Sequence, residues 1–405
     1  MSEMSYLEKL LDGVEVEWRN LGDTSLFEIA NNGRKPVKAS LRIAGETPYY
    51  GANNIQDYVD GYTHDGEYVL IAEDGSASLE NYSIQYATGK FWANNHVHVV
   101  RGKERIHSRF LYHYLCIVNF LPFLTGGGRA KLTKGQLIEI PVPIPCPENP
   151  EKSLAIQSEI VRILDKFTAL TAELTAELNM RKKQYNYYRD QLLSFDEEQE
   201  KPIYLEKLLD GVEVEWKLLG DASFFEIANN GRKPVKSSLR IAGKTPYYGA
   251  NNIQDYVDGY THDGEYVLIA EDGSASLENY SIQYATGKFW ANNHVHVVRG
   301  KTRVNSRFLF HYLHIVNFIP FLTGGVRAKL TKGQLIEISV PIPCPDNTEK
   351  SLAIQAEIVR ILDKFDTLTN SITEGLPREI ELRQKQYEYY RDLLFSFPKP
   401  ETVSN

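Results

Sequence analysis

Cysteine is scarce in this sequence, which has three in 405 residues, at Cys116, Cys146 and Cys344. Three scattered thiols provide neither a disulfide framework nor a paired-cysteine metal site, so we expect all three to be structural. Long apolar runs are also missing. No stretch approaches the roughly 18 apolar residues that a membrane span needs, and the N-terminus has charges where a signal peptide has its apolar core. We therefore expect a cytoplasmic protein with no membrane segment.

Positive charge is in short supply, since 45 Lys and Arg face 53 Asp and Glu and the net charge is −8. This balance argues against a DNA-binding protein that is covered in positive surface. The objection weakens if the cations gather in loops, or if partner subunits supply most of the phosphate contacts. With 42% hydrophobic and 24% charged residues, the chain has the composition of a globular protein of two or three domains.

Catalytic signatures are missing too. There is no glycine-rich cofactor loop after a strand, no Walker A sequence, and no Asn/Asp-Pro-Pro-aromatic motif of amino-methyltransferases. His96 and His98 have the spacing of one strand face, but no further ligand motif lies near them, so strand packing or DNA contact is favoured over metal binding. The EDGSAS sequence at Glu73–Ser78 is typical of a turn. We expect no catalytic residues and no metal site.

The sequence contains a long internal duplication. Residues 6–18 recur unchanged 198 residues later at 204–216, and residues 47–103 are identical to residues 245–301. The match continues through FLTGGGRAKLTKGQLIEI and FLTGGVRAKLTKGQLIEI, and then through SLAIQSEIVRILDKF and SLAIQAEIVRILDKF. The chain is therefore built as A-B-A-B, with two parts in each repeat.

The A part is expected to be mixed α/β with a majority of strands. Runs such as EYVLIAE, SIQYAT and HVHVVRG are rich in β-forming residues and are separated by turn signals. Apolar spacings of three and four residues predict a helix at 108–124. The sequence IPVPIPCPENPEK should then end the domain in an extended conformation, because its prolines lack backbone donors.

The B part has the pattern of a long amphipathic helix. Apolar residues from Ile160 to Leu192 mark one face, and the TAELTAEL tandem at Thr171–Leu178 adds a four-residue step to the stripe. In the second copy Gly375 and Pro377 should interrupt or kink the helix. A helix of about 40 residues is on the order of 60 Å long. Since neither helix buries its stripe alone, we expect the two to pair antiparallel, with one A domain at each end.

These residues resemble a known family. A domain ending in TGG-x-RAKLTKGQLIEI-PVPIPCP, followed by EKSLAIQSEIVRILDKF and a long helix, twice over, is similar to the specificity subunits of type I restriction-modification enzymes. The TAEL tandem resembles the subgroup with such tetrapeptides in its central region. The resemblance implies an α+β protein with two target-recognition domains at 1–150 and 200–348, and two conserved coiled-coil helices at 151–199 and 349–398.

The resemblance also implies what the chain binds. Each A domain is expected to read half of a split site in double-stranded DNA, while the helices act as spacer and docking surface for two methyltransferase subunits, which restriction subunits join. S-adenosylmethionine, ATP and magnesium are expected on those partners, with no cofactor bound by this chain. Because the central reading stretch is the same in both copies, two-fold related domains should read an interrupted palindrome. The alternatives are a coiled-coil adaptor without a DNA role and, less favoured, a nuclease.

Three polar clusters in each A domain are candidate DNA contacts, each against the plainer interpretation of a surface loop or turn. Arg grips guanine edges, Asn and Gln pair with adenine, and Lys neutralises phosphate. A glycine-rich turn also lets the backbone approach the duplex closely. In the first domain the candidates are Arg34, Lys35, Lys38 and Arg42, then Asn53, Asn54 and Gln56, then Arg129, Lys131 and Lys134. In the second they are Arg232, Lys233, Lys236 and Arg240, then Asn251, Asn252 and Gln254, then Arg327, Lys329 and Lys332.

Overall fold

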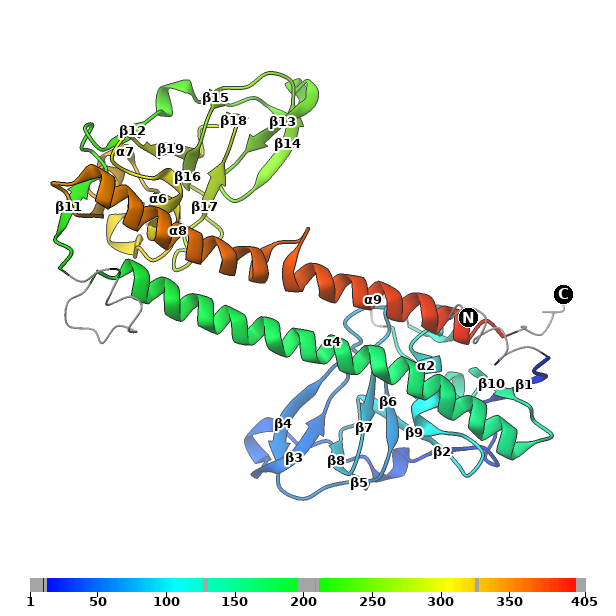
Figure 1. The fold of residues 1–405 in the computed structure, drawn as a ribbon. Coiled ribbons are helices and arrows are strands. Elements are labelled where there is room, and N and C mark those ends of the chain that lie inside the picture. The colour runs from blue at the N-terminus through cyan, green and yellow to red at the C-terminus, as the bar shows by residue number, and fades with distance from the viewer. Residues whose placement is uncertain are drawn as a thin grey trace. The chain divides into compact units, whose positions relative to one another are not determined.

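The computed structural model describes residues 10, 13–126, 130–195, 208, 211–324 and 328–397. The chain divides into two compact units: one holds residues up to Leu174 together with those from Glu379 onward, and the other is Thr175–Arg378. Each unit contains one α/β domain and segments of the long helices (Figure 1). The prediction of an α+β protein with a repeated domain and long helices that pack together is confirmed.

The first domain consists of short strands and short helices that precede one long helix. Its strands are β1 (Val16–Asn20), β2 (Phe27–Ile29), β3 (Ala44–Tyr50), β4 (Ile55–Val59), β5 (His64–Asp65), β6 (Tyr68–Ala72), β7 (Ile84–Ala87), β8 (Lys90–Ala93), β9 (Val97–Gly102) and β10 (Pro141–Pro145). Its helices are η1 (Asn31–Gly33), η2 (Ala39–Leu41), α2 (Ser108–Leu115), η3 (Leu121–Phe123) and α3 (Lys134–Leu137), before α4 (Pro150–Leu193).

The second domain repeats these elements in the same order. Its strands are β11 (Val214–Leu218), β12 (Phe225–Ile227), β13 (Ala242–Tyr248), β14 (Ile253–Val257), β15 (His262–Asp263), β16 (Tyr266–Ala270), β17 (Ile282–Ala285), β18 (Lys288–Ala291), β19 (Val295–Gly300) and β20 (Ser339–Pro343). Its helices are η4 (Asn229–Gly231), η5 (Ser237–Leu239), α6 (Ser306–Leu313), η6 (Ile319–Phe321) and α7 (Lys332–Leu335), before α8 (Thr348–Asn370) and α9 (Gly375–Leu394).

The core of each domain lies on both faces of one strand, which is β6 in the first domain and β16 in the second. In the first domain, β2, β9, β6 and β7 form an antiparallel sheet, and β4, β3, β8 and β5 form a second sheet in which β3 and β8 are parallel. Val69 and Ile71 of β6 join the core that includes α2, whereas Tyr68 and Leu70 join a separate cluster with Phe91 of β8. Burial on both faces explains why β6 has the continuous apolar sequence YVLIA instead of an alternating one.

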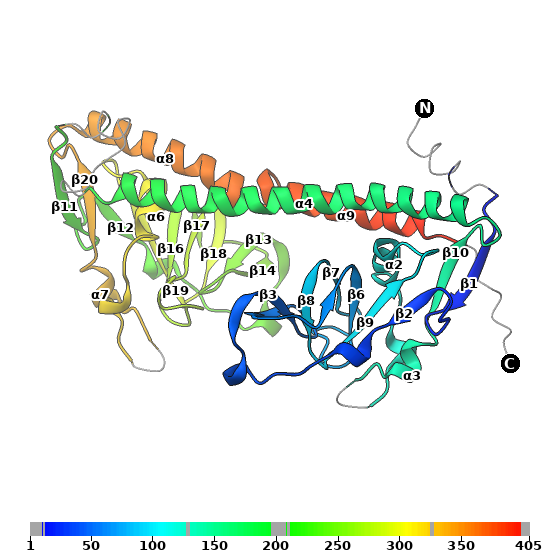
Figure 2. The same cartoon turned by 90° about the horizontal axis from the view of Figure 1, so that it is seen from below.

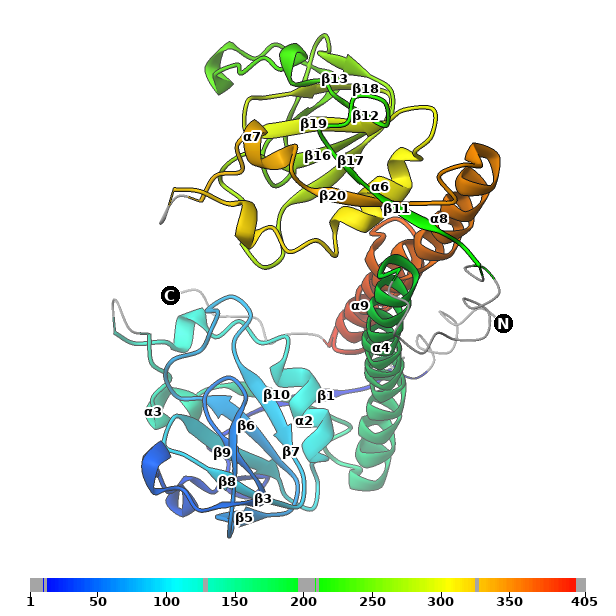
Figure 3. The same cartoon turned by 90° about the vertical axis from the view of Figure 1, so that its left-hand side faces the viewer.

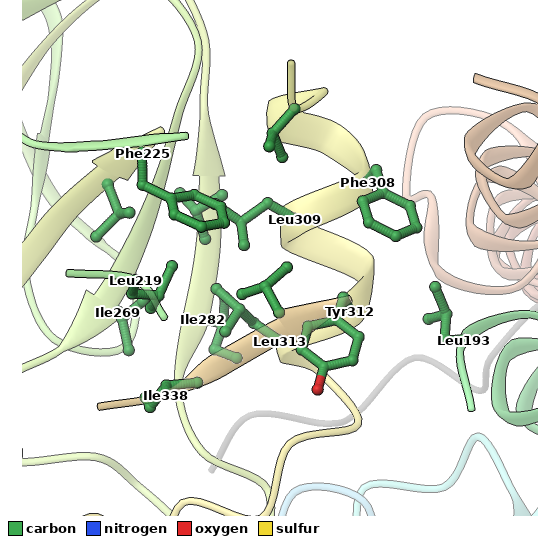
Figure 4. Close-up of a cluster of buried hydrophobic side chains, with 14 of the residues drawn as sticks. Leu193, Leu219, Phe225, Ile269, Ile282, Phe308, Leu309, Tyr312, Leu313 and Ile338 are labelled. Carbon is green, nitrogen blue, oxygen red and sulfur yellow. The ribbon is translucent and has the colours of Figure 1, made fainter. Parts of the chain in front are cut away.

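Figure 4 shows the corresponding core of the second domain, where Leu309 and Leu313 of α6 lie near Ile269 of β16 and Ile282 of β17. Leu193, near the end of α4, belongs to the same core. The second domain therefore packs against a helix that begins in the first repeat.

The first part of the proline-rich segment is extended, as predicted, and it forms a strand, whereas Pro150 already begins α4. β10 pairs antiparallel with β1 in a two-stranded sheet, with Pro143 opposite Trp18 and Pro145 opposite Val16. Alternate prolines are compatible with such an edge pair because the missing donors all lie on one side of the strand. β20 pairs with β11 in the same way.

The helix predicted at 108–124 is shorter than expected, since α2 ends at Leu115 and only the 3-10 turn η3 follows. The amide groups of Ile117 and Val118 bond to carbonyls three residues back, which tightens the last turn. The Asn119 side chain then accepts a hydrogen bond from the Leu121 amide and starts η3, with Pro122 in its first turn. The helix therefore ends before the apolar periodicity does, because Asn119 and Pro122 start a new 3-10 turn.

The second long helix is broken where the sequence predicted an interruption. α8 ends at Asn370 and α9 begins at Gly375, whose φ of 78° suits glycine. A Cβ at Gly375 would lie 2.4 Å from the carbonyl oxygen of Thr367, so the chain passes too close to α8 for any side chain there. Pro377 lies in the first turn of α9, where a proline is tolerated. In contrast, α4 runs unbroken through the TAEL tandem.

Within each unit the start of one long helix packs against the end of the other. In the first unit, Phe167 of α4 stacks on Tyr390 of α9, with ring centroids 5.3 Å apart. In the second, Tyr188 of α4 stacks on Phe365 of α8 at 5.6 Å. These two pairs are equivalent positions of the duplicated sequence. Figures 1 and 2 show that the paired segments run in opposite directions within each unit.

A buried histidine fixes α2 to the helices in the first unit. His113 Nε2 lies 2.8 Å from Asp165 Oδ1 of α4, and its Nδ1 lies 3.2 Å from the hydroxyl of Tyr387 of α9. Arg109 donates to the same carboxylate at 2.8 Å. Burial lowers the pKa of His113 to about 4, although the bond to Asp165 acts in the opposite direction. At neutral pH the imidazole is therefore uncharged and bridges three elements.

We expect the first unit to lose stability in mild acid through His113. Because the pKa of His113 is about 4 in the folded state and near 6.5 when unfolded, its stabilising contribution is complete above pH 6.5 and is lost as pH falls toward 4. A drop from pH 6.5 to pH 5 should cost roughly 2 kcal/mol from this group. Urea unfolding of His113→Gln should give a shallower pH dependence than wild type over this range. Parallel pH dependences would contradict this role.

Candidate nucleic-acid interface

The loop from Glu73 to Ala77 brings together the three polar clusters that the sequence singled out. The Glu73 carboxylate accepts a hydrogen bond from Arg34 Nη1 at 2.6 Å, and the Lys131 ammonium lies 3.0 Å from its other oxygen. The Asn53 amide donates to the Gly75 carbonyl and accepts from the Ala77 amide, both at 2.8 Å. One short loop after β6 thus contacts η1, the β3–β4 turn and the segment before α3.

The second domain has the same arrangement at equivalent residues. Glu271 bonds to Arg232 at 2.6 Å and to Lys329 at 3.0 Å. Asn251 donates to the Gly273 carbonyl at 2.9 Å and accepts from the Ala275 amide at 2.8 Å. The site is therefore built twice from nearly identical contacts. Figure 3 shows the two domains, with most of their strands and the short helices α2, α3, α6 and α7 labelled.

We call Glu73 and the two cations that it binds, Arg34 and Lys131, the hub. Hydrogen bonds to Glu73 set the electrostatics of this hub. Burial alone would raise the pKa of Glu73, but the hydrogen bonds from Arg34 and Lys131 hold it below its usual value. The same contact with Glu73 raises the pKa of Lys131. The carboxylate therefore stays ionised and neutralises two cations that the sequence offered as DNA contacts.

His98 supports the hub from beneath as a neutral side chain. It is fully buried, its Nδ1 lies 2.9 Å from the Asn31 side-chain nitrogen, and its Nε2 lies 2.7 Å from the Leu132 carbonyl. Burial lowers its pKa, and the two contacts fit a tautomer with the proton on Nε2. His98 thereby connects η1 to the segment that leads into α3.

The expectation that His96 and His98 share one strand face is wrong. β9 begins at Val97, so His96 precedes the strand, and its side chain is exposed and lies 2.5 Å from Asp74. The turn at residues 94–96, where the Asn94 side chain accepts from the His96 amide, breaks the alternation. In the described part of the chain, no group of three or more His, Cys, Asp or Glu side chains is placed to hold a metal ion.

In addition to Lys131, three of the candidate side chains in the first domain are held by internal contacts. Besides Glu73, Arg34 donates to the Val97 carbonyl at 2.8 Å. Arg42 stacks over the buried ring of Tyr49 at 4.1 Å and pairs with Asp57 at 3.2 Å. Asn53 uses both ends of its amide on the 75–77 loop. These groups shape the surface, and their polar atoms are already engaged.

The other described candidates present exposed polar groups. Lys35, Lys38, Asn54, Gln56 and Lys134 are all exposed, and none of these side chains bonds to another described residue. Lys134 opens α3, whose first turn is fixed by a capping box between Thr133 and Gln136. Lys131 is partly exposed beside Glu73. Arg129 and Arg327 lie outside the described residues.

The second domain divides its candidates in the same way. Arg232 and Arg240 pair with Glu271 and Asp255, and Asn251 is bonded to the 273–275 loop. The residues with exposed side chains are Lys233, Lys236, Asn252, Gln254 and Lys332. The structure thus leaves one set of exposed cations and amides in each domain, beside a second set whose side chains are engaged in contacts within the domain.

Sequence reasoning treated the EDGSAS segment only as a turn and missed its role as the centre of the site. The candidate DNA contacts were chosen for positive charge or an amide group. Glu73 has neither, so its residue type did not indicate a role in the site. Its position within the identical 47–103 stretch was the available indication. Gln85, which donates to the Gly51 carbonyl at 2.9 Å and supports the Asn54 turn, was missed for the same reason.

Glu73→Gln should destabilise the hub of the first domain. A neutral amide cannot form charge-assisted bonds with both Arg34 and Lys131, and each such bond is worth about 1.5–3 kcal/mol. We expect a loss on the order of 2 kcal/mol in the free energy of unfolding by urea titration. Glu80→Gln, at an exposed glutamate in the loop before β7, is the control and should be neutral. Equal stabilities for the two variants would refute the role of Glu73.

Comparison with known proteins places this chain in a family. The family model described as the type I restriction modification DNA specificity domain matches residues 14–181 and again residues 213–382. These two matches coincide with the two copies of the duplicated sequence and together cover most of the chain.

Curated relatives match over nearly the full length. A putative type I restriction enzyme specificity subunit of Haemophilus influenzae is 46% identical over 97% of this chain and 98% of its own. The EcoR124I/EcoR124II specificity subunit of Escherichia coli is 38% identical over the whole of both chains. Among solved structures, the type I restriction-modification S subunit from M. genitalium has the same fold, with a TM-score of 0.66 at 17% identity, covering 96% of this chain and 98% of its own.

No helix in the described residues is both long and apolar enough to cross a membrane. The duplicated domains, the long helices and the matches to both repeats lead to one conclusion: this chain belongs to the DNA specificity subunits of type I restriction-modification systems, the non-catalytic components of those complexes.

Proposed function

We propose that this chain directs a type I methyltransferase to a bipartite DNA site whose two halves form an interrupted palindrome. The main support is the near-identity of the two polar sites. Between Phe27 and Lys103 only two positions differ from Phe225–Lys301, Ala39 against Ser237 and Glu46 against Lys244. Every exposed candidate in that range is the same residue in both domains, so both should read the same half-sequence.

Within each domain we assign base contact to the exposed amides and phosphate contact to the exposed lysines. Asn54 and Gln56 present free amides of the type that pairs with adenine. Lys35, Lys38 and Lys134, which are exposed in the same domain, are assigned to phosphate contact. Arg34, Arg42 and Asn53 are assigned to support because their polar groups are engaged internally. This division answers the objection from the net charge, because many acidic groups pair within the protein.

The long helices are proposed to separate the two readers and to bind two methyltransferase subunits, which restriction subunits join in the complete enzyme. S-adenosylmethionine, ATP and magnesium would then be bound by those partners. We also propose that the chain belongs to the subgroup with TAEL repeats. Each added TAEL unit would lengthen α4 by about 6 Å and so change the spacing of the half-sites.

The experiment is binding of a DNA library by the chain together with its cognate methyltransferase subunit, over a range of salt concentrations. We expect sequence-specific complexes that weaken steeply with salt, because each phosphate contact releases a counterion. A chain that binds its partner yet leaves DNA binding unchanged would be an adaptor, and this result would refute the proposal.

A further inference from the structure

Each domain carries a pair of exposed aliphatic side chains that neither its core nor the polar site uses. Leu41 and Ile43 are 69% and 71% exposed, and their equivalents Leu239 and Ile241 are also 69% and 71% exposed. Large aliphatic groups this exposed are costly in water. Their recurrence at the same positions in both domains shows that the same surface is presented twice.

These side chains lie on a firmly constructed tip. The segment begins in the 3-10 turn η2, where the Leu41 amide bonds to the Lys38 carbonyl at 2.9 Å, and the Ile43 carbonyl accepts from the Asp60 amide at 2.8 Å. Between the two aliphatic residues, Arg42 turns inward to stack on Tyr49. Leu41 and Ile43 therefore stay exposed because the backbone and the intervening arginine are fixed, and their exposure is not that of a loose loop.

The close approach at the base of the tip requires glycine. A Cβ at Gly45 would lie 2.5 Å from the Asp60 amide nitrogen, and one at Gly243 would lie 2.4 Å from that of Asp258. Any other residue would push the tip away from the neighbouring strand. In the second domain Leu239 and Ile241 also border a hollow whose other walls include Val257 and Trp290. The surface thus offers a small apolar contact area that is formed by several side chains.

Charge indicates which partner fits this surface. Lys35 and Lys38 precede the tip directly and are exposed, as are Lys233 and Lys236 in the second domain. Glu46 lies three residues beyond Ile43 in the first domain, and Lys244 takes its place in the second. Of the acids beside the tip, Asp57 is paired with Arg42, and the exposed Asp60 accepts a hydrogen bond from the Gly61 amide at 2.9 Å. A small rigid apolar tip that follows cations suits a base edge flanked by phosphates, and the apolar group on a base edge is the 5-methyl group of thymine.

We propose that Leu41 and Ile43, together with Leu239 and Ile241, form an apolar contact with thymine methyl groups in each half-site. This inference rests on the proposed function, because it assigns a further specificity contact to the same DNA-reading domains. It adds apolar recognition to the amide and lysine contacts, and it predicts that the half-site contains thymine near the bases read by Asn54.

The test uses the complex with its methyltransferase subunit and two versions of one duplex that carries the target, amplified with dTTP or with dUTP. Uracil lacks only the 5-methyl group. Losing one buried methyl contact weakens binding about 3- to 4-fold, so loss in both half-sites should weaken wild-type binding about 10-fold. The variant Leu41→Ala, Ile43→Ala, Leu239→Ala, Ile241→Ala should bind both duplexes equally, at the affinity of wild type for the uracil duplex.

The outcomes separate this inference from the proposed function. Equal wild-type affinity for both duplexes, or a variant that keeps the preference for thymine, would overturn the contact while leaving DNA recognition intact. A variant that binds both duplexes more weakly with an unchanged ratio would assign the tip to a wedge between base steps. Weaker binding of the methyltransferase subunit with an unchanged ratio would assign it to a protein contact. Absence of specific DNA binding by the wild-type complex would refute the proposed function itself.

Discussion

Replacing Asn54 and Asn252 by alanine is expected to abolish most methylation at the target site. Both amides are exposed and free of contacts with described residues, and each lies in a turn held by a bonded neighbour, Asn53 or Asn251. A bidentate amide-adenine pair is worth about 1–3 kcal/mol. Loss in both half-sites should therefore lower specific binding by roughly 30-fold to 20,000-fold. Initial methylation rates at limiting enzyme measure the effect.

Single variants and a matched control sharpen this prediction. Asn54→Ala and Asn252→Ala should each produce about half of the free-energy loss, since distant sites are additive. The control Asn81→Ala with Asn279→Ala removes the same amide chemistry from exposed positions outside the candidate set, and it should keep wild-type rates. If the control and the test variants lost methylation equally, Asn54 and Asn252 would not be base readers.

A chain that ends at residue 198 is expected to form a homodimer with the same DNA target. In the intact protein the first unit is completed by residues from Glu379 onward, which pack on the start of α4. The end of α4 has an equivalent sequence and plays the same role for α8. A half-length chain contains both of these helix surfaces, and each can be covered only by the other surface of a second copy. Light scattering should therefore give twice the monomer mass.

The half-length chain should also guide methylation to the unchanged palindrome when its partner subunit is present. Replacing Leu192 and Leu193 by aspartate places charges in a face that is buried in the intact protein, and so should prevent dimerisation and methylation together. This double substitution is the control for an effect of shortening alone. A stable half-length monomer, or a dimer with a different target, would contradict the exchange of helix ends between units.

The repeat, the long helices and most strands were predictable because they depend on local patterns. The break at Gly375 followed from residue type, and β6, β7 and β9 followed from runs of β-forming residues. The end of α2 was not predictable from apolar spacing, because Pro122 and the hydrogen bond from the Leu121 amide to the Asn119 side chain act against a periodicity that continues past them. The start of η3 therefore decides where α2 ends, although the apolar spacing continues.

The site was predictable in location and less so in the roles of its residues. All three candidate clusters contact the Glu73–Ala77 loop. The sequence alone does not distinguish the roles of Arg34 and Lys35, which are adjacent basic residues. In the structure Arg34 is bound to Glu73, whereas Lys35 is exposed. That difference depends on a carboxylate 39 residues away in the chain, and no local pattern reports such a contact.

Genome-wide mapping of methylated bases, in cells that express this chain with its methyltransferase partner, tests the central claim most directly. Two identical readers should yield one bipartite motif whose halves are reverse complements, with one methylated base on each strand. A bipartite motif with two unrelated halves would show that the duplicated domains do not read DNA as equivalent, two-fold related copies.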